Sequence, residues 1–426
     1  MILFCSGYFL GLPEKRMIEK ETDDSKEEES PKLNLQSSKF LENQISLQTS
    51  TLQEVSFKTP DDPNKSEESI KEFLLRAQAE SNPILRNASF AQALGNLNAD
   101  NLEDVLETFK SLPFGFEHIQ EYRMLLYAWG QFDPLAAIDY CKERASGIGA
   151  GFATAGVLEG WASRDPQSAL TWVKSPENAG MAKLYNFGLI RGWASSDLDA
   201  ASNYAERLEG NEDLNKISGI LIDQNKKQGG FAQASSWANS LANGHLKEGA
   251  FSSMSRKFAR DQPEKLAEWM KIHANEKYAA NAFENLGKRW SETDPKSSIE
   301  YFSNLPRGKS QELGIKGSIS NWAKQDPVAA GEWLNQRDSG PQLDSALAAY
   351  ASTVSIIDGG AAMEWAVSIS DFELQTSVIK KVGQEWYRQD KDAVDIWLPE
   401  SGLSKEEQKK IRNPPKKNWW QKLQER

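Results

Sequence analysis

From residue 82 onwards, the pattern of apolar, capping and turn-forming positions repeats at a nearly constant interval. Nine anchor positions mark this repeat, and seven of the eight intervals between them are 32 residues long while one is 33. The anchors are eight aspartates and one glycine: Asp133, Asp165, Asp197, Gly229, Asp261, Asp294, Asp326, Asp358 and Asp390. A fixed period of this length is the sequence signature of repeat architectures. We therefore expect one supersecondary unit per period, packed against its neighbours.

Twelve of the 14 tryptophans occupy two fixed positions in this period. Six lie four residues before an anchor: Trp129, Trp161, Trp193, Trp290, Trp322 and Trp386. Six lie seven or eight residues after one: Trp172, Trp237, Trp269, Trp333, Trp365 and Trp397. Three units carry tyrosine at the second position: Tyr140, Tyr204 and Tyr301. Because a stack needs the same aromatic packing at every level, we predict buried structural pairs rather than a carbohydrate or methyl-lysine platform.

The anchor aspartates predict where helices start. An aspartate side chain accepts hydrogen bonds from the free N–H groups of a first helical turn. Proline suits the next position, and it follows four anchors directly: Pro134, Pro166, Pro295 and Pro327. Each unit is then a hairpin with a first helix of about four turns and a second of about three. Because neighbouring anchors lie roughly 10 Å apart in packed helices, they cannot share a metal ion or a proton.

About ten hairpins fit between residues 82 and 403, the first opening at Asn82-Pro83 with a second helix over 101–109. The unit reads W-A-x-x-D-P-x-x-A-x-x-W, as in residues 161–172. This pattern resembles tetratricopeptide-type α-solenoids and, more closely, uncharacterised bacterial proteins with tandem repeats of the same motif. The resemblance implies an all-α, right-handed α-solenoid with a binding or scaffolding surface and no reaction. The period departs from the 34-residue tetratricopeptide unit, so no peptide-clamp residue is carried over.

Two segments precede the repeats. Residues 1–12 are uncharged and mostly apolar, too short to cross a bilayer. Two readings stay open for them: the distal part of a truncated signal-anchor, or an apolar terminus that packs on the protein. Residues 13–80 read as an acidic, flexible linker with a short helix near 67–79, beginning after Ser66. This layout suits a domain tethered at the cell envelope or in the periplasm, with a cytoplasmic location as the alternative.

Residues 404–426 read as a capping helix followed by a basic tail. Ser404 and Glu407 form the sequence pattern of a capping box, and Asn413-Pro414-Pro415 ends the helix. The tail mixes lysines with Trp419 and Trp420. It either docks on the repeats or contacts anionic lipid or an acidic partner.

Charge and composition narrow the function classes. Hydrophobic residues make up 39% of the chain, enough with glycine for a packed globular core. The net charge is −11, distributed as −6 over residues 14–80, −10 over the middle and +5 over 404–426. An acidic body opposes a groove that reads RNA or DNA. Two cysteines and three histidines cannot supply a disulfide framework or a His-rich metal centre.

Cys141, the histidines and the glycine-rich run are predicted to have structural roles. Cys141 is predicted to be a small buried hydrophobe. Three histidines are expected on surface loops between hairpins: His118, His245 and His273. The glycine-rich run over 147–151 reads as a loop that opens the helix ending at Trp161, because no strand precedes it as a phosphate loop requires.

Two units depart from the pattern. At Gly229-Gly230 the aspartate, the proline and the first tryptophan are missing, and Asn225 occupies the tryptophan position. At Asp358-Gly359-Gly360 the proline is lost, and Val354 replaces the tryptophan. Glycine relaxes the preset geometry of a turn. Hinges or changes of curvature are one reading, and ordinary drift in a tolerant repeat is the other.

These observations predict a non-enzymatic helical-repeat scaffold or protein–protein interaction module. No catalytic, cofactor-binding or metal-binding residue is predicted, and neither a small-molecule substrate nor a nucleic-acid partner. The partner is expected to be a protein, bound in the groove lined by residues outside the motif. The alternative is an α/α-toroid or superhelical domain associated with polysaccharide or peptidoglycan processing, which the short inter-helix connections disfavour.

Overall fold

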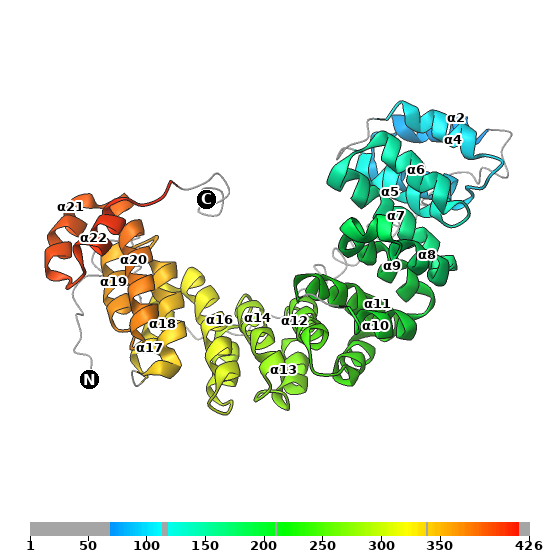
Figure 1. The fold of residues 1–426 in the computed structure, drawn as a ribbon. Coiled ribbons are helices and arrows are strands. Elements are labelled where there is room, and N and C mark those ends of the chain that lie inside the picture. The colour runs from blue at the N-terminus through cyan, green and yellow to red at the C-terminus, as the bar shows by residue number, and fades with distance from the viewer. Residues whose placement is uncertain (1–68, 113–117, 209–210, 338–339, 417–426) are drawn as a thin grey trace, which may run out of the picture. The chain divides into compact units, whose positions relative to one another are not determined.

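The computed structural model describes residues 69–112, 118–208, 211–337 and 340–416. Within these ranges the chain forms 21 α-helices, a few short 3₁₀ helices and no strand (Figure 1). The prediction of an all-α fold is confirmed. The apolar segment 1–12, most of the linker and the tail from residue 417 lie outside the described residues.

The helices follow one another as pairs, each made of a first and a second helix. The first helices are α3 (Pro83–Gly95), α5 (Ile119–Gly130), α7 (Gly147–Arg164), α9 (Ala182–Ser196), α12 (His245–Phe258), α14 (Ala280–Trp290), α16 (Lys309–Gln325), α18 (Pro341–Val354) and α20 (Phe372–Gln389). The second helices are α4 (Leu102–Lys110), α6 (Pro134–Arg144), α8 (Pro166–Val173), α10 (Leu198–Ala205), α13 (Pro263–Lys271), α15 (Pro295–Ser303), α17 (Pro327–Asn335), α19 (Gly359–Val367) and α21 (Lys391–Trp397). One further pair is joined in α11 (Asn211–Ser240), which bends at Gly229 and Gly230.

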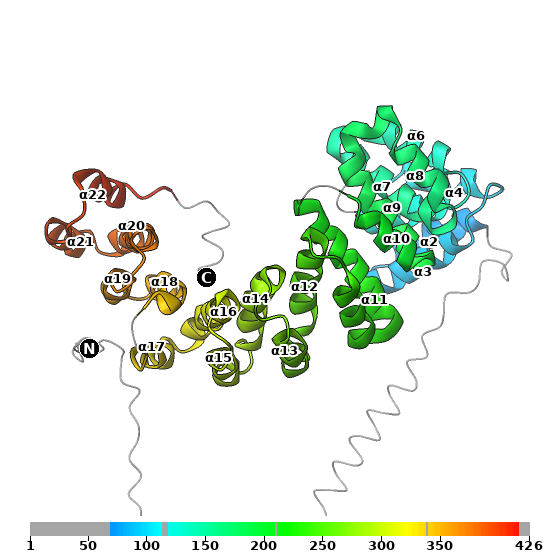
Figure 2. The ribbon, with the colours of Figure 1, turned by 60° about the horizontal axis from the view of Figure 1, so that its bottom comes forward.

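Each first helix packs on the first helix of the next pair, as α7 does on α9 and α14 on α16. Figure 2 shows α12, α14 and α16 in one row and α13, α15 and α17 in another. A lone helix pair cannot cover its apolar face, so it is buried against the neighbouring pairs. The buried apolar side chains accordingly form a continuous cluster from Leu158 to Val382.

Seven of the eight anchor aspartates cap a helix through the side chain. Each accepts a hydrogen bond from the backbone N–H three residues later, as Asp294 does from Ser297 at 3.0 Å. The others are Asp133, Asp165, Asp197, Asp326, Asp358 and Asp390. The exception is Asp261: α13 begins one residue later, at Pro263, with Gln262 in the cap position. The displaced proline moves the start of the helix, so the aspartate no longer faces the free N–H groups.

This difference gives a matched test of capping. Replacing Asp294 by alanine leaves the Ser297 N–H without its acceptor, and we expect a loss of about 1 kcal/mol in the free energy of unfolding. Asp261→Ala removes no cap, so its effect should stay within about 0.5 kcal/mol. Urea unfolding followed by circular dichroism measures both. Equal losses in the two variants would contradict the assignment.

The repeat tryptophans are interior residues, as predicted. All twelve are buried or half-buried. Five first-site tryptophans pair with the aromatic residue eleven positions later in the same helix pair: Trp129–Tyr140, Trp161–Trp172, Trp193–Tyr204, Trp290–Tyr301 and Trp386–Trp397, with ring centroids 5.4, 6.4, 5.7, 5.6 and 6.0 Å apart. Trp237 also donates its indole N–H to the Ser202 hydroxyl of the preceding pair at 2.9 Å. The aromatic residues therefore join helices both within and between pairs.

Glycines set the spacing between neighbouring first helices, a role that was not predicted from the sequence. A Cβ atom on any of six glycines would lie 2.0–2.3 Å from a backbone oxygen of the adjacent helix: Gly130, Gly160, Gly188, Gly192, Gly287 and Gly317. Real Cβ atoms do not approach an oxygen so closely. The absence of a side chain thus lets the backbones touch.

Two local predictions need correction. The glycine-rich run over 147–151 is not a loop, because α7 begins at Gly147 and includes all of it. The first described helix, α2 (Ile70–Ala79), starts after Ser69 and not after Ser66. A capping box between Ser69 and Glu72 fixes that start. The helix buries Phe73 against α3 and α4 and belongs to the packed core.

The carboxyl end of the repeats is covered by α22 (Lys405–Arg412). The capping box of Ser404 and Glu407 opens this helix, as predicted. Its single buried side chain, Ile411, packs beside Gly383 of α20 and with Val394. Trp419 and Trp420 lie outside the described residues, so the two readings of the basic tail remain open.

The irregular unit at Gly229-Gly230 is bent. Gly230 has a φ of 62°, which side chains rarely adopt, and helical geometry is lost at both glycines. Asn225 is fully buried in the tryptophan position, where its amide donates to the Leu221 carbonyl at 2.9 Å. The second irregular unit keeps its cap at Asp358 and leaves room for the Trp386 ring above Gly359.

Candidate partner-binding groove

Two adjoining hollows lie over the first helices α5, α7, α9, α11 and α12. Their volumes are about 450 and 630 Å³, and they share Ile220 and Asp223. We call them together the first-helix groove, lined by Arg123, Tyr127, Glu159, Arg191, Gly192, Ser195, Asn215, Lys216, Gly219, Ile220, Asp223, Gln224, Lys227, Arg256 and Lys257. Five successive helices therefore contribute to one continuous surface.

The repeat explains why these residues meet. Tyr127, Glu159, Arg191 and Asp223 follow one another at intervals of 32 residues, so they occupy equivalent positions on four neighbouring first helices. Residues three, four, seven or eight apart share one face of a helix. On α11 this face carries Ile220 and, one turn further along, Asp223 and Gln224. No described residue of a second helix lines either hollow, so the groove belongs to the first helices.

Ion pairs alternate across the floor of the groove. Glu159 lies between Arg123 and Arg191, with oxygen–nitrogen distances of 3.4 and 3.2 Å. Its side chain is only 15% exposed, whereas the two arginine side chains are 51% and 44% exposed. On the next helices, Asp223 pairs with Lys257. Glu159 thus lies deeper than the two guanidinium groups, which remain accessible from solvent, whereas Asp223 is 52% exposed and its partner Lys257 is 26% exposed.

Cations outnumber carboxylates in the groove. The lining includes six lysines and arginines but two acidic residues, an excess of four positive charges on a chain of net charge −11. Among the described residues, Lys216, Lys227 and Arg256 have no carboxylate partner. Lys216 contacts the ring of Phe187 and Arg256 donates to two serine hydroxyls. The surface attracts anions locally in spite of the overall charge.

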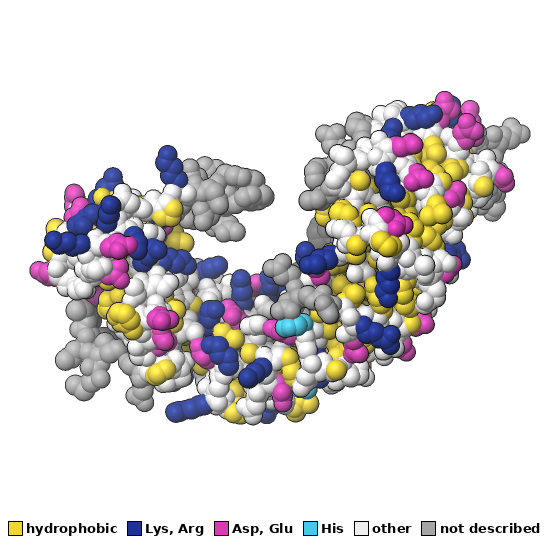
Figure 3. Space-filling view, viewed as in Figure 1, with side chains coloured by type: hydrophobic (Ala, Val, Ile, Leu, Met, Phe, Trp, Pro, Cys, Tyr) yellow, Lys and Arg dark blue, Asp and Glu magenta, His cyan; other side chains and the backbone are white. Residues whose placement is uncertain are grey.

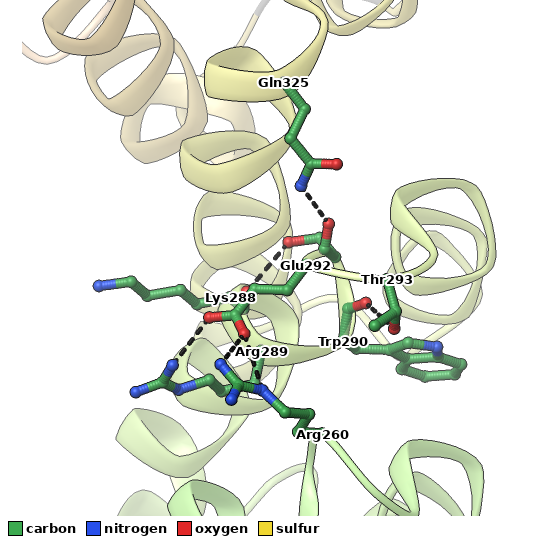
Figure 4. A network of polar contacts seen from close by, with 8 residues as sticks. Arg260, Lys288, Arg289, Trp290, Glu292, Thr293 and Gln325 are labelled. Atoms are coloured by element: carbon green, nitrogen blue, oxygen red, sulfur yellow. Dashed lines mark hydrogen bonds and ion pairs between the residues drawn. The ribbon is translucent and has the colours of Figure 1, made fainter.

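A second polar network lies beyond the groove, where α12 meets the next first helices α14 and α16 (Figure 4). Glu292, just after α14, accepts hydrogen bonds from Arg260 at 2.6 and 3.1 Å and from Arg289 at 2.8 Å. Gln325 of α16 donates to the Ser291 carbonyl at 2.8 Å. The network ties α12, α14 and α16 together.

In Figure 3, basic side chains gather over α12–α16, whereas apolar side chains gather over α6 and α8.

The Glu292 network predicts an acid-sensitive contribution to stability. Partial burial opposes ionisation of Glu292, but hydrogen bonds and charge from Arg260 and Arg289 outweigh it and lower the pKa of the carboxyl. A lowered folded-state pKa stabilises the protein above the unfolded-state pKa, and this contribution is lost as pH falls through the folded-state pKa. Glu292→Gln should therefore cost about 0.5–1 kcal/mol at neutral pH and nothing in strong acid.

The pH dependence of urea unfolding measures this effect. Glu264→Gln, on the exposed face of α13, is the matched control and should leave the acid limb of the profile unchanged. An identical profile for the two variants would contradict the role of Glu292.

The predicted positions of the histidines are partly wrong. His273 is half-buried: its Nδ1 lies 2.9 Å from the Tyr278 hydroxyl and its Nε2 lies 3.1 Å from Asn239 Oδ1. Burial and the nearby positive charge of Lys247 lower the pKa of His273. The imidazole joins two consecutive helix pairs through its aromatic and polar contacts. His118 lies just before α5, and His245 is the first residue of α12 and lies 3.6 Å from Glu248.

The reactive groups of the described residues do not gather into a centre. Cys141 is fully buried, and burial raises the pKa of its thiol to about 12. A thiol with that pKa is a poor nucleophile at neutral pH. Within the described ranges, no group of three His, Cys, Asp or Glu side chains is arranged to hold a metal ion.

The sequence matches no protein-family model, no curated protein and no solved structure. Among the helices that the structure describes, none is long and apolar enough to cross a membrane.

The residues of the groove were not predicted from the sequence. A signal was present: Glu159, Arg191 and Asp223 alternate in charge at one position of the repeat. Opposite charges at equivalent positions of neighbouring units predict ion pairs between those units. Lys216, Lys227 and Arg256 do not occupy one repeated position, so their place in the groove could be found only from the structure.

Proposed function

We propose that this chain is a non-enzymatic α-solenoid of about ten helix hairpins that binds a protein partner along the first-helix groove. One observation carries the proposal: equivalent positions of four successive first helices, together with Arg256 and Lys257 of the fifth, build a continuous, charged and solvent-accessible surface. Repeat proteins use extended surfaces of this kind for binding. The period of 32 residues and the packing of each helix pair on its neighbours support a right-handed solenoid similar to tetratricopeptide proteins.

The chemistry of the groove favours binding over catalysis. Each carboxylate on its floor is engaged with cations of the neighbouring helices, Glu159 with two arginines and Asp223 with a lysine. General acid–base catalysis needs a carboxyl or similar group free to exchange a proton with a bound substrate. Ion-paired carboxylates instead hold accessible guanidinium groups in place. Such groups recognise carboxylates through paired hydrogen bonds.

A photo-crosslinking amino acid at Gln224, in the groove, tests the proposal in native cells. We expect discrete adducts whose partner peptides can be identified by mass spectrometry. The matched control places the same amino acid at Lys271, which is exposed on the second helix α13. Absence of adducts from the groove position, or the same adducts from both positions, would contradict the proposal.

We further propose that the chain is tethered at the cell envelope through its apolar residues 1–12. Their composition and the acidic linker that follows support this location. Fractionation of native cells that express the full chain, or a variant lacking residues 1–12, measures it. The full chain should be recovered with the membranes and the variant with the soluble proteins, whereas identical fractionation would contradict the tether.

A further inference from the structure

We infer that the first-helix groove takes an extended, acidic peptide segment of a partner protein. This inference rests on the proposed binding function and names the chemistry of the partner. It does not follow from the overall charge of the chain, which is −11 and would repel an acidic ligand. It follows from the local excess of cations in the groove.

The unpaired cations lie on both sides of the groove floor. Lys216 and Lys227 are exposed on α11, on either side of Asp223, and Arg256 is exposed on the adjacent helix α12. Unpaired, accessible cations pay no cost of breaking an existing ion pair when they meet a carboxylate. Arg123 and Arg191 share the single carboxylate of Glu159, so they too retain donors for a ligand.

The dimensions of the groove set the length of the segment. Neighbouring packed helices lie about 10 Å apart, so the five first helices span roughly 40 Å. An extended chain advances about 3.3 Å per residue, which corresponds to a segment of about 12 residues. Groups of opposite charge alternate across these helices, from Arg123 to Glu159, Arg191, Asp223 and Lys257. The segment is therefore expected to alternate acidic residues with neutral polar ones.

The same alternation disfavours a nucleic acid. A single strand carries a negatively charged phosphate on every nucleotide. Some of these phosphates would lie beside the carboxylates of Glu159 and Asp223 and be repelled by them. Sequence-independent binding of single strands also uses several aromatic side chains for base stacking. The only aromatic residue in the lining of the groove is Tyr127. A peptide can place neutral residues where the carboxylates lie, and a phosphate backbone cannot.

Fluorescence anisotropy with the full chain tests the inference. The probe is a labelled peptide of about 12 residues, with Glu or Asp at alternate positions and Ser or Gly between them, at low salt. A peptide with Gln and Asn in place of the acids is the neutral probe, and oligothymidine of equal charge is the nucleic-acid probe. We expect the acidic peptide to bind more tightly than both.

Charge reversal identifies the site of binding. The triple variant Lys216→Glu, Lys227→Glu and Arg256→Glu should weaken binding of the acidic peptide at least about tenfold, which corresponds to two or three lost ion pairs. The control triple reverses exposed lysines on three second helices: Lys110→Glu, Lys271→Glu and Lys296→Glu. Because both triples change the net charge equally, the control should bind within about twofold of the wild type. Thermal unfolding checks that both variants remain folded.

Each contrary outcome has a distinct meaning. Equal weakening by the two triples would show attraction by net charge alone and overturn the inference. Tighter binding of oligothymidine that the groove triple abolishes would overturn it in favour of a nucleic-acid ligand. Discrete adducts at Gln224 that map to neutral or basic partner segments would overturn the acidic peptide while the binding function stands. Absence of groove adducts, by contrast, is a failure of the proposed function itself.

Discussion

Replacing Gly188 by valine is expected to lower the free energy of unfolding by about 3 kcal/mol, the upper end of the range for overpacked sites. Gly188 is buried where α9 crosses α7, and a Cβ atom there would lie 2.0 Å from the backbone oxygen of Ala155. A backbone oxygen in a helix cannot rotate away as a side chain can. The two first helices would have to separate, and the contacts between two consecutive pairs would be lost with them.

Gly156 provides the matched control, because it lies on the neighbouring helix α7 in the same layer. A Cβ atom there would meet the nearest side-chain atom, Leu126 Cβ, at 3.7 Å, an ordinary contact distance. Gly156→Ala should therefore stabilise the protein by about 0.5–1 kcal/mol, since alanine restricts the unfolded chain. Urea unfolding followed by far-UV circular dichroism measures both variants. A Gly188→Val protein as stable as the wild type would refute the close helix contact.

Local chemistry made the helix boundaries predictable. A cap such as Asp326 acts on N–H groups within three residues of itself, so sequence spacing alone identifies it. The tryptophan pairs were predictable for a related reason: eleven residues across a short turn return the chain to the same level of the stack, as in Trp386 and Trp397. Asp261 shows the limit, because one displaced proline moved the cap without changing the period.

Features that depend on neighbouring units were harder to predict. Gly192 of α9 lies close to the backbone of Glu159 in α7. This contact depends on how the two helices are aligned along their axes, which the sequence of a single helix does not determine. His273 was expected on a surface loop, yet its imidazole reaches Asn239 of the preceding unit. The groove belongs to the same class, because it exists only where five helices lie side by side. Whether a cation of the groove has a carboxylate partner depends on the positions of all nearby acidic side chains, which the sequence does not give.

A second large effect is expected at Phe302, in the second helix α15. Its side chain is fully buried, and its ring centroid lies 6.3 Å from that of Phe283 in an edge-to-face arrangement. The ring lies over glycines of two first helices, Gly287 of α14 and Gly314 of α16. Phe302→Ala should lower the free energy of unfolding by about 4 kcal/mol, through lost burial and the cavity that remains. Urea unfolding measures the loss.

Gly314, beneath that ring, allows a double-mutant test of whether the ring and the glycine share the same space. A Cβ atom on Gly314 would lie 2.0 Å from Cδ1 of Phe302, so Gly314→Ala should destabilise the wild-type protein by about 1–3 kcal/mol. In the Phe302→Ala background the ring is gone, and the same methyl group occupies the vacated space while alanine favours the helix. Gly314→Ala is then expected to be stabilising, with a coupling energy above about 1 kcal/mol in the double-mutant cycle. Additive losses would mean that the ring and the glycine do not share this space, and that the second helices do not pack into the gaps that the first-helix glycines provide.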